Sequence, residues 1–263
     1  QGREWHPALS PDGTRVAFVR RLPDSSHSDL FIKQRDSEAA LKLTDGPGWV
    51  AWPAWSPDGQ SLAFVRGEAG QSVLCTVASL GGPVRRLQEV ASFVDGLDWS
   101  PDGQYLVYSA LAEDSGVHRL FQLSRVDMAV RILPVAEDDH AGDFQPCVSP
   151  DGSQLAWLSV GQDGTGHIFG RSLKGTQGRQ VTGGLAAVQG LAWSAGGRAL
   201  VYAASLGGAF SLWEVGVGTA SGPSQTARWL PTSGDFAWNP TISRETGDLA
   251  FEQVRVDQDL WRV

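Results

Sequence analysis

Short apolar segments alternate with polar turns along the whole chain, and the alternation repeats with a long period. The first cycle contains apolar stretches at residues 6–10, 15–20, 29–34 and 40–44. Brief runs rich in β-branched and aromatic residues, bounded by Gly, Pro, Asp and Ser, are typical of strands. Apolar positions do not recur with helical periodicity. One cycle therefore predicts four antiparallel strands.

A tetrapeptide marks the same point in each cycle. Ser-Pro-Asp-Gly begins at Ser10, Ser56, Ser100 and Ser149, and degenerate forms begin at Ser194 and Ser243. Pro presets φ, Asp bonds to the local backbone and Gly accepts positive φ, so each copy predicts a tight hairpin turn. The interval of 44 to 49 residues suits one four-stranded propeller blade. The sequence predicts an all-β, six-bladed propeller of four-stranded antiparallel blades.

The residue two positions before each anchor serine is small in most repeats, which is expected where inner strands crowd toward an axis. Asp98 breaks this pattern. Two interpretations remain open for it. Its carboxylate either lines the central channel or accepts a hydrogen bond from a nearby backbone N–H.

The segment Pro53–Arg66, PAWSPDGQSLAFVR, resembles the PD40, or WD40-like, repeat of TolB-type propellers. The resemblance extends over the whole chain, although blades five and six depart from it at residues 195–196 and 244–246. Related repeats build TolB, the substrate-gating propellers of prolyl-oligopeptidase-like and tricorn peptidases, oligogalacturonate lyases, and sensor domains of membrane-bound winged-helix regulators. The resemblance implies a periplasmic, extracytoplasmic location.

The composition of the chain limits its domain count and the classes of partner it can bind. The 263 residues are 41% hydrophobic and include 32 glycines, so we expect a single propeller domain over residues 1–263. The net charge of −8 disfavours contact with nucleic acid. No apolar run reaches membrane-spanning length, so we expect no membrane insertion by this domain.

The ends of the repeat suggest a piece excised from a longer protein. The third strand of blade six is expected at 259–263, which leaves this blade without its outer strand. An unpaired strand edge invites association, so the missing strand is expected just before residue 1. A short trimmed strand is the alternative.

The sequence contains no recognisable catalytic or metal-binding motif. It contains neither a Gly-x-Ser-x-Gly elbow nor a His-Glu-x-x-His pair, so we expect no catalytic residues, metal site or cofactor. Cys75 and Cys147 fall in blades two and four, which do not touch in a six-membered ring. A disulfide would require much closer Cα atoms, so both are expected to be buried free thiols.

A surface with aromatic and acidic residues is the remaining candidate site. Loops that lead into inner strands, together with loops between second and third strands, emerge on one face of a propeller. The candidate binding residues there are Trp5, His6, Trp49, Trp52, Phe93, Asp95, Asp138, Asp139, His140, Phe144, Asp235 and Trp238. Rigid rings rimmed by carboxylates suit a protein or peptide partner. Each ring alternatively packs beneath its own loop.

All five histidines map to the same face. His140 follows Glu137, Asp138 and Asp139, whose carboxylates favour a protonated imidazole. A proton or metal sensor is one interpretation, and a chance gathering in long polar loops is the other.

The leading hypothesis is a non-enzymatic propeller that binds a protein or peptide partner through this face. It would serve as the extracytoplasmic sensor domain of a membrane-bound winged-helix transcriptional regulator or as a TolB-like adaptor. The alternative is the accessory, substrate-gating propeller of a prolyl-oligopeptidase-like serine peptidase.

Overall fold

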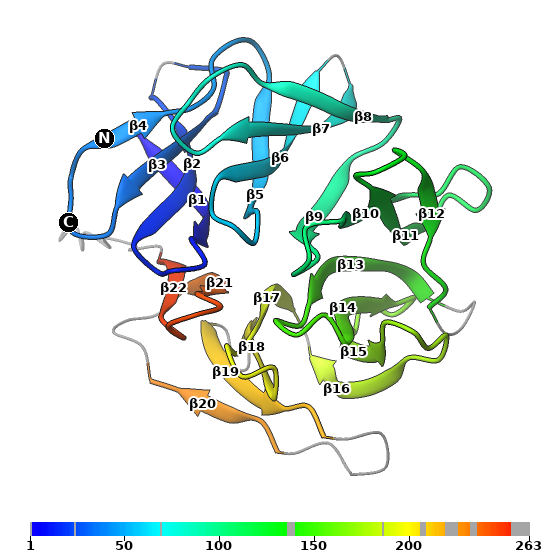
Figure 1. Ribbon diagram of the computed structural model, residues 1–263. Helices are drawn as coiled ribbons and strands as arrows, with labels where there is room; N and C mark the ends of the chain where they lie inside the picture. The colour runs from blue at the N-terminus through cyan, green and yellow to red at the C-terminus, as the bar shows by residue number, and fades with distance from the viewer. Residues whose placement is uncertain are drawn as a thin grey trace, which may run out of the picture.

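The computed structural model describes residues 2–23, 25–68, 70–135, 140–185, 187–205, 209–218, 226–231 and 236–253, with only the backbone at residue 140. Within these ranges the chain forms strands and turns and no helix. The sheets stand around a central axis as the blades of a propeller (Figure 1). The predicted all-β fold is confirmed.

Each blade is built from consecutive strands. Blade one comprises β1 (Arg3–Leu9), β2 (Arg15–Arg21), β3 (Asp29–Gln34) and β4 (Ala40–Lys42). Blade two comprises β5 (Trp49–Trp55), β6 (Ser61–Glu68), β7 (Gln71–Ala78) and β8 (Arg85–Val90). Blade three comprises β9 (Val94–Trp99), β10 (Tyr105–Leu111), β11 (His118–Ser124) and β12 (Val130–Ile132). Blade four comprises β13 (His140–Val148), β14 (Gln154–Gly161), β15 (Gly166–Ser172) and β16 (Arg179–Leu185). Blade five comprises β17 (Val188–Trp193), β18 (Ala199–Ser205), β19 (Phe210–Gly216) and β20 (Arg228–Leu230), and blade six contains β21 (Ala237–Ile242) and β22 (Leu249–Gln253).

The first strand of every blade lies innermost, and these six strands close a ring. Each inner strand contacts the inner strand of the next blade, and β21 contacts β1 (Figure 1). Blades three and four are also joined by one parallel pairing between His118 and Gly142. The third strand expected in blade six, and the outer strand expected to be missing from it, lie outside the described residues.

The predicted hairpin turns share one geometry. In the four intact copies the serine hydroxyl donates to the aspartate Oδ1 at 2.5–2.6 Å. The turn glycine is left-handed in all six blades, with φ between 63° and 75°. Glycine adopts this conformation without a Cβ penalty, which explains why it survives in the degenerate turns.

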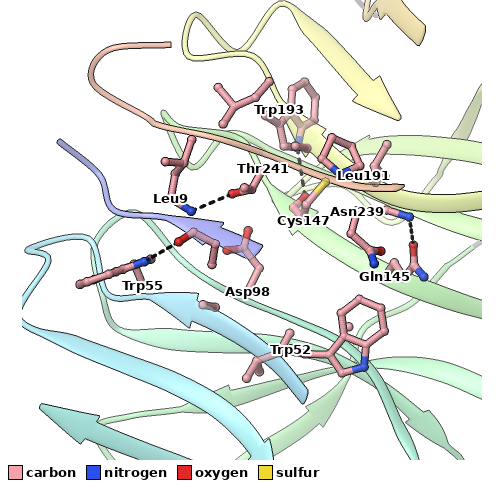
Figure 2. A pocket seen from close by; sticks show the side chains of 18 of the residues that line it. Leu9, Trp52, Trp55, Asp98, Gln145, Cys147, Leu191, Trp193, Asn239 and Thr241 are labelled. Atoms are coloured by element: carbon pink, nitrogen blue, oxygen red, sulfur yellow. Dashed lines mark hydrogen bonds between the residues drawn. The ribbon is translucent and has the colours of Figure 1, made fainter. Parts of the chain in front are cut away.

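Tryptophans just before the anchor serines join neighbouring inner strands. Each donates its indole N–H to a backbone carbonyl of the preceding blade. Figure 2 shows the bonds of Trp55 and Trp193. The bonds run from Trp55 to Ala8 at 2.9 Å, from Trp99 to Ala54 at 3.1 Å and from Trp193 to Cys147 at 3.1 Å. These large side chains fill the space between blades.

At two junctions between blades that lack such a tryptophan, a different hydrogen bond joins the inner strands. Val148 N–H donates to Asp98 Oδ2 at 2.8 Å. Leu9 N–H donates to Thr241 Oγ1 at 3.2 Å (Figure 2). In both cases a polar side chain of one blade satisfies a backbone donor of the next. Asp98 therefore has a structural role that compensates for the valine.

Both cysteines are buried and unpaired, as expected. Cys75 lies in β7 and Cys147 in β13, two non-adjacent blades. Burial raises the pKa of the Cys75 thiol to about 11 and that of Cys147 well above its usual value. Both thiols therefore remain protonated and unreactive near neutral pH.

Candidate functional site

All six inner strands carry a bulge at the same height, four residues before the anchor serine. The bulge residues have positive φ: His6 at 49°, Trp52 at 52°, Gly96 at 94°, Gln145 at 49°, Gly190 at 80° and Asn239 at 46°. The register of each inner strand with its neighbour shifts at this point. We call these six residues the mouth ring.

The mouth ring holds itself together through contacts between neighbouring blades. Trp52 N–H donates to His6 Nδ1 at 3.3 Å, and the two rings stack with their centroids 4.1 Å apart. Gly190 N–H donates to Gln145 Oε1 at 2.8 Å (Figure 2). Four non-glycine residues in the left-handed region are uncommon, and such strain persists only where surrounding contacts impose it.

The mouth ring surrounds one end of a central cavity of about 170 Å³. Two of its buried polar atoms, Trp52 Nε1 and Asn239 Oδ1, have no hydrogen-bond partner among the described residues. Buried polar groups are rarely left unpaired in native proteins, and exceptions concentrate at sites of function or of bound water. Arg244 Nη1, at the opposite end of the cavity, is likewise buried without a partner among the described residues. The mouth ring therefore supplies two of the three such atoms in the residues that line this cavity.

An ion pair crosses the axis at the anchor end of the same cavity. Arg244 Nη2 lies 3.2 Å from Asp98 Oδ1 and donates to Trp99 O at 3.0 Å. Arg244 belongs to blade six and Asp98 to blade three, which stand opposite each other in the ring. The side chains of the pair are only 22% and 21% exposed. Arg244 occupies the proline position of the turn, so its departure from the repeat supplies this connection.

Asp98 combines both roles that its sequence position suggested. Its carboxylate lines the cavity, and it also accepts a hydrogen bond from the backbone N–H of Trp99 at 2.8 Å. Burial raises the pKa of Asp98, whereas the Arg244 charge and the hydrogen bonds from Val148 and Trp99 act in the opposite direction.

The predicted aromatic residues form pairs between adjacent blades. The ring of Trp49 lies 5.3 Å from that of Phe93, Phe144 lies 4.7 Å from His118, and Trp238 lies 5.5 Å from Phe210. Trp5, Trp49, Trp52 and Phe144 are half-buried and pack against core clusters. Phe93 is 54% exposed.

The structure places the predicted residues at different parts of this face. His6 and Trp52 line the central cavity, and Trp5 and Trp238 line an adjoining hollow between blades one and six. Trp49, Phe93 and Phe144 form the rim between blades. Asp95 lies beside Gly96 and bonds to Gln145. The side chains of Asp138, Asp139, His140 and Asp235 lie outside the described residues.

Burial shifts the pKa of two groups at the mouth. It lowers the pKa of His6 to about 4, so this imidazole is neutral at pH 7. It raises the pKa of Asp95 to about 6, while a hydrogen bond from Gln145 acts in the opposite direction. Burial also lowers the pKa of His118. His6 and His118 are therefore poorly suited to sensing protons near neutral pH.

Replacing His6 with asparagine should change how stability depends on pH. Asparagine tolerates the left-handed backbone, as Asn239 shows at the matching position. His6 has a folded pKa below its unfolded value of about 6.5, so its contribution to stability is present above pH 6.5 and is lost as the pH falls toward 4. Wild type should lose up to roughly 3 kcal/mol relative to His6→Asn between pH 6.5 and 4.

Urea unfolding of both proteins across this pH range measures the difference. Asp95, whose folded pKa is raised, contributes stability that is lost as the pH rises from about 4 to about 6, and this effect cancels in the comparison. A pH-independent difference between the two proteins would contradict the burial of a neutral His6.

The sequence interpretation missed Gln145, Asn239, Gly96, Gly190 and Arg244. A signal for the mouth ring was present: four of the six bulge residues directly precede a proline, at Pro7, Pro53, Pro146 and Pro240. The two exceptions are glycines, whose missing side chains make room for the neighbouring blade. A Cβ at Gly96 would lie 2.5 Å from Gln145 Cα, and one at Gly190 would lie 2.5 Å from Asn239 Cα.

The described part of the chain offers no group of three or more His, Cys, Asp or Glu side chains suited to holding a metal ion. No helix within it is both long and apolar enough to cross a membrane.

Several curated proteins share sequence similarity with this chain. The peptidase YuxL of Bacillus subtilis is 33% identical over 117 residues, which are 42% of this chain and 18% of YuxL. Dipeptidyl-peptidase 5 of Porphyromonas endodontalis is 29% identical over 107 residues, 39% of this chain and 16% of that protein. The protein Atu1656 of Agrobacterium fabrum is 24% identical over 157 residues, 59% of this chain and 50% of Atu1656. The matched segments thus span half or less of each relative.

Solved structures share the fold. A putative TolB from Agrobacterium tumefaciens superposes with a TM-score of 0.71 at 18% identity, covering 96% of this chain and 91% of its own. TolB from Acinetobacter baumannii gives 0.71 at 16% identity, with coverage of 88% and 58%. A prolyl endopeptidase gives 0.58 at 17% identity, covering 92% of this chain and 38% of its own.

A family model also matches the chain itself. The model describes the TolB beta propeller domain and its PD40 repeat, and it matches residues 1–140, more than half of the sequence. This match agrees with the repeated turns and with the ring of blades. The chain therefore belongs to the TolB beta propeller domain family.

Proposed function

We propose that this propeller binds an extended segment of a protein partner at the mouth ring and does so without catalysis. The observation that carries the proposal is the left-handed backbone of His6, Trp52, Gln145 and Asn239 at one height of the ring. Backbone strain of this kind clusters at ligand-binding sites.

Side-chain chemistry at the mouth supports the same proposal. The stacked His6–Trp52 pair gives a rigid aromatic surface at one side. Gln145 and Asn239 place amide groups elsewhere on the ring. Gln145 Oε1 and Asn239 Nδ2 already bond to Gly190 and Glu252, and Asn239 Oδ1 is left to accept a hydrogen bond from the peptide N–H of an extended chain. Aromatic anchors next to amides suit peptide recognition because the rings supply contact area and the amides supply orientation.

Glycine substitutions in the mouth ring test this proposal. A random peptide library displayed on phage is selected against the immobilised propeller, and the Kd of one selected peptide is measured. Trp52→Gly and Gln145→Gly keep the left-handed backbone, as Gly96 and Gly190 do naturally, and each should weaken binding by about tenfold or more. Leu80→Ala is the matched control, because this residue is 84% exposed in the loop between β7 and β8, on the face that carries the anchor turns.

Thermal unfolding of each variant separates lost binding from lost structure. Gln145→Gly is the more informative variant, since Trp52 also packs against the core. If both glycine variants bind the peptide as wild type does, the mouth ring is not the binding site.

For the whole protein we propose a TolB-like adaptor, or the extracytoplasmic sensor domain of a membrane-bound winged-helix regulator. The family match and the structural likeness to TolB support a periplasmic setting. The coding sequence of the parent protein tests this proposal: an upstream winged helix followed by one apolar segment of about 20 residues supports the sensor.

A second candidate is the accessory propeller of a serine peptidase. The similarity to YuxL and dipeptidyl-peptidase 5 favours it, although the matched segments are small parts of those proteins. In that setting the mouth ring would limit which peptides reach a separate catalytic domain. A downstream α/β-hydrolase sequence in the parent reading frame would support this candidate over the first.

A further inference from the structure

A second hollow of about 320 Å³ lies beside the mouth, between blades one and six. Its walls include Arg3, Trp5, Arg21 and Trp238. It shares His6 and Asn239 with the central cavity, so the two spaces adjoin at the mouth ring. A ligand seated in the mouth can therefore extend one group into this hollow.

Two arginines face each other in this hollow. Arg3 of β1 pairs directly with Arg21 of β2 in the antiparallel ladder. Like charges in this arrangement repel, and they destabilise a sheet unless an anion neutralises them. Among the described residues neither arginine takes part in an ion pair.

The next residue pair along the same two strands carries opposite charges. Glu4 pairs with Arg20, and Arg20 Nη2 lies 2.5 Å from Glu4 Oε1. Successive residues of a strand point to opposite faces, so this ion pair lies on the other side of the sheet from Arg3 and Arg21. The ladder therefore pairs Arg20 with a carboxylate and leaves Arg3 and Arg21, both exposed, without an ion pair at the edge of the hollow. Glu252 is the one carboxylate among the residues that line it.

The carboxylate of Glu252, which also lines the hollow, is already engaged. It accepts a hydrogen bond from Asn239 Nδ2 at 3.0 Å and another from the backbone N–H of His6. Burial raises the pKa of Glu252, whereas these bonds and the nearby charge of Arg3 act in the opposite direction, so Glu252 offsets part of the Arg3 charge. The remaining polar groups of the lining include the amides of Gln189 and Asn239, which carry both donors and acceptors, and two N–H donors. Trp238 Nε1 is buried without a partner among the described residues, and His6 accepts through Nδ1, which leaves its proton on Nε2.

We propose that this hollow is an anion site, in which Arg3 and Arg21 bind a carboxylate or phosphate group of the ligand. Guanidinium groups pair with both anions through two parallel hydrogen bonds. Positive charge in this hollow contrasts with the net charge of −8 on the whole chain. The inference deepens the proposed function, because it assigns an acidic group to the ligand beside the mouth ring.

NMR titration of the ¹⁵N-labelled protein tests the site. The indole N–H signal of Trp238, assigned with Trp238→Phe, reports on the hollow. Three probes are added separately: acetyl-tetraalanine with a free carboxylate, the same peptide with an amidated end, and inorganic phosphate. We expect the free carboxylate, phosphate or both to move the signal, and the amidated peptide to leave it unchanged.

Substitutions of the paired arginines show whether these side chains bind the anion. Arg3→Gln and Arg21→Gln should each weaken anion binding about tenfold. Arg20→Gln is the matched control, because it removes an arginine from the other face of the same ladder, and it should leave binding unchanged. Binding should also weaken as salt concentration rises.

The two sources of the anion give different results. A response to the carboxylate alone indicates the chain end or acidic side chain of a peptide, and a response to phosphate alone indicates a phosphorylated ligand. No response to any probe, or equal responses in wild type and both arginine variants, would overturn the anion site. Anion binding that persists when no library peptide binds the mouth would leave this site standing without the proposed function.

Discussion

Replacing Asp98 with alanine should lower the free energy of unfolding by about 3 to 5 kcal/mol, the range expected when one partner of a largely buried ion pair is removed. The change leaves the Arg244 charge without its carboxylate and removes the acceptor of Val148 N–H. It also breaks the connection between blades three and six across the axis. Chemical denaturation with guanidinium chloride measures the loss.

Two further variants separate charge from hydrogen bonding at this point. Asp98→Asn keeps an acceptor for Val148 N–H and should cost less than the alanine change. Asp127→Ala removes an exposed carboxylate that bonds only within its own turn, and it should leave the denaturation midpoint close to that of wild type. An Asp98→Ala midpoint within error of wild type would show that the axial ion pair contributes nothing to holding the ring.

Gly96→Ala should destabilise the protein by about 3 kcal/mol or more, because the new methyl group meets backbone atoms of the next blade. Its Cβ would lie 2.5 Å from Gln145 Cα and 3.1 Å from Pro146 Cδ. Neither atom can move without shifting blade four. Thermal and chemical unfolding both report the effect.

Gly81→Ala is the matched control for backbone strain. Gly81 has φ of 90°, close to the 94° of Gly96, but a Cβ there would meet nothing within 4 Å. Its replacement should therefore cost only the strain of a left-handed alanine, about 1 to 2 kcal/mol. Equal losses in the two variants would mean that close packing between blades three and four is absent.

The fold was predictable because its determinants are local. Each Ser-Pro-Asp-Gly turn contains the hydroxyl, the carboxylate and the glycine that define its own geometry, as at Ser10 and Gly13. The second, third and fourth strands of blade one begin at the predicted residues 15, 29 and 40. Neither prediction required knowledge of which blades touch.

The candidate site was predictable only in part, because its contacts join distant segments. Asp98 stood out in the sequence, but its partner Arg244 is 146 positions away and belongs to a degenerate turn. The like-charged pair of Arg3 and Arg21 depends on the register of β1 against β2, which shifts at the bulge between Trp5 and Ala8. Sequence spacing alone does not reveal such a shift.

The aromatic residues illustrate the same limit. Trp49 and Trp52 were predicted to share a face, and the structure places both in β5 of blade two. Sequence could not show that Trp52 stacks on His6 while Trp49 contacts Phe93. The choice between exposed and packed rings depends on how adjacent blades meet.

The most direct test of a binding site at the mouth is to map backbone amide shifts in the ¹⁵N-labelled propeller when a library-selected peptide binds. The amides of Gly96, Gln145 and Gly190 should show the largest shifts, because they line the mouth ring. The turn glycines Gly59 and Gly103 should remain unchanged on the opposite face. Shifts confined to those turns, with the mouth ring unaffected, would contradict the account.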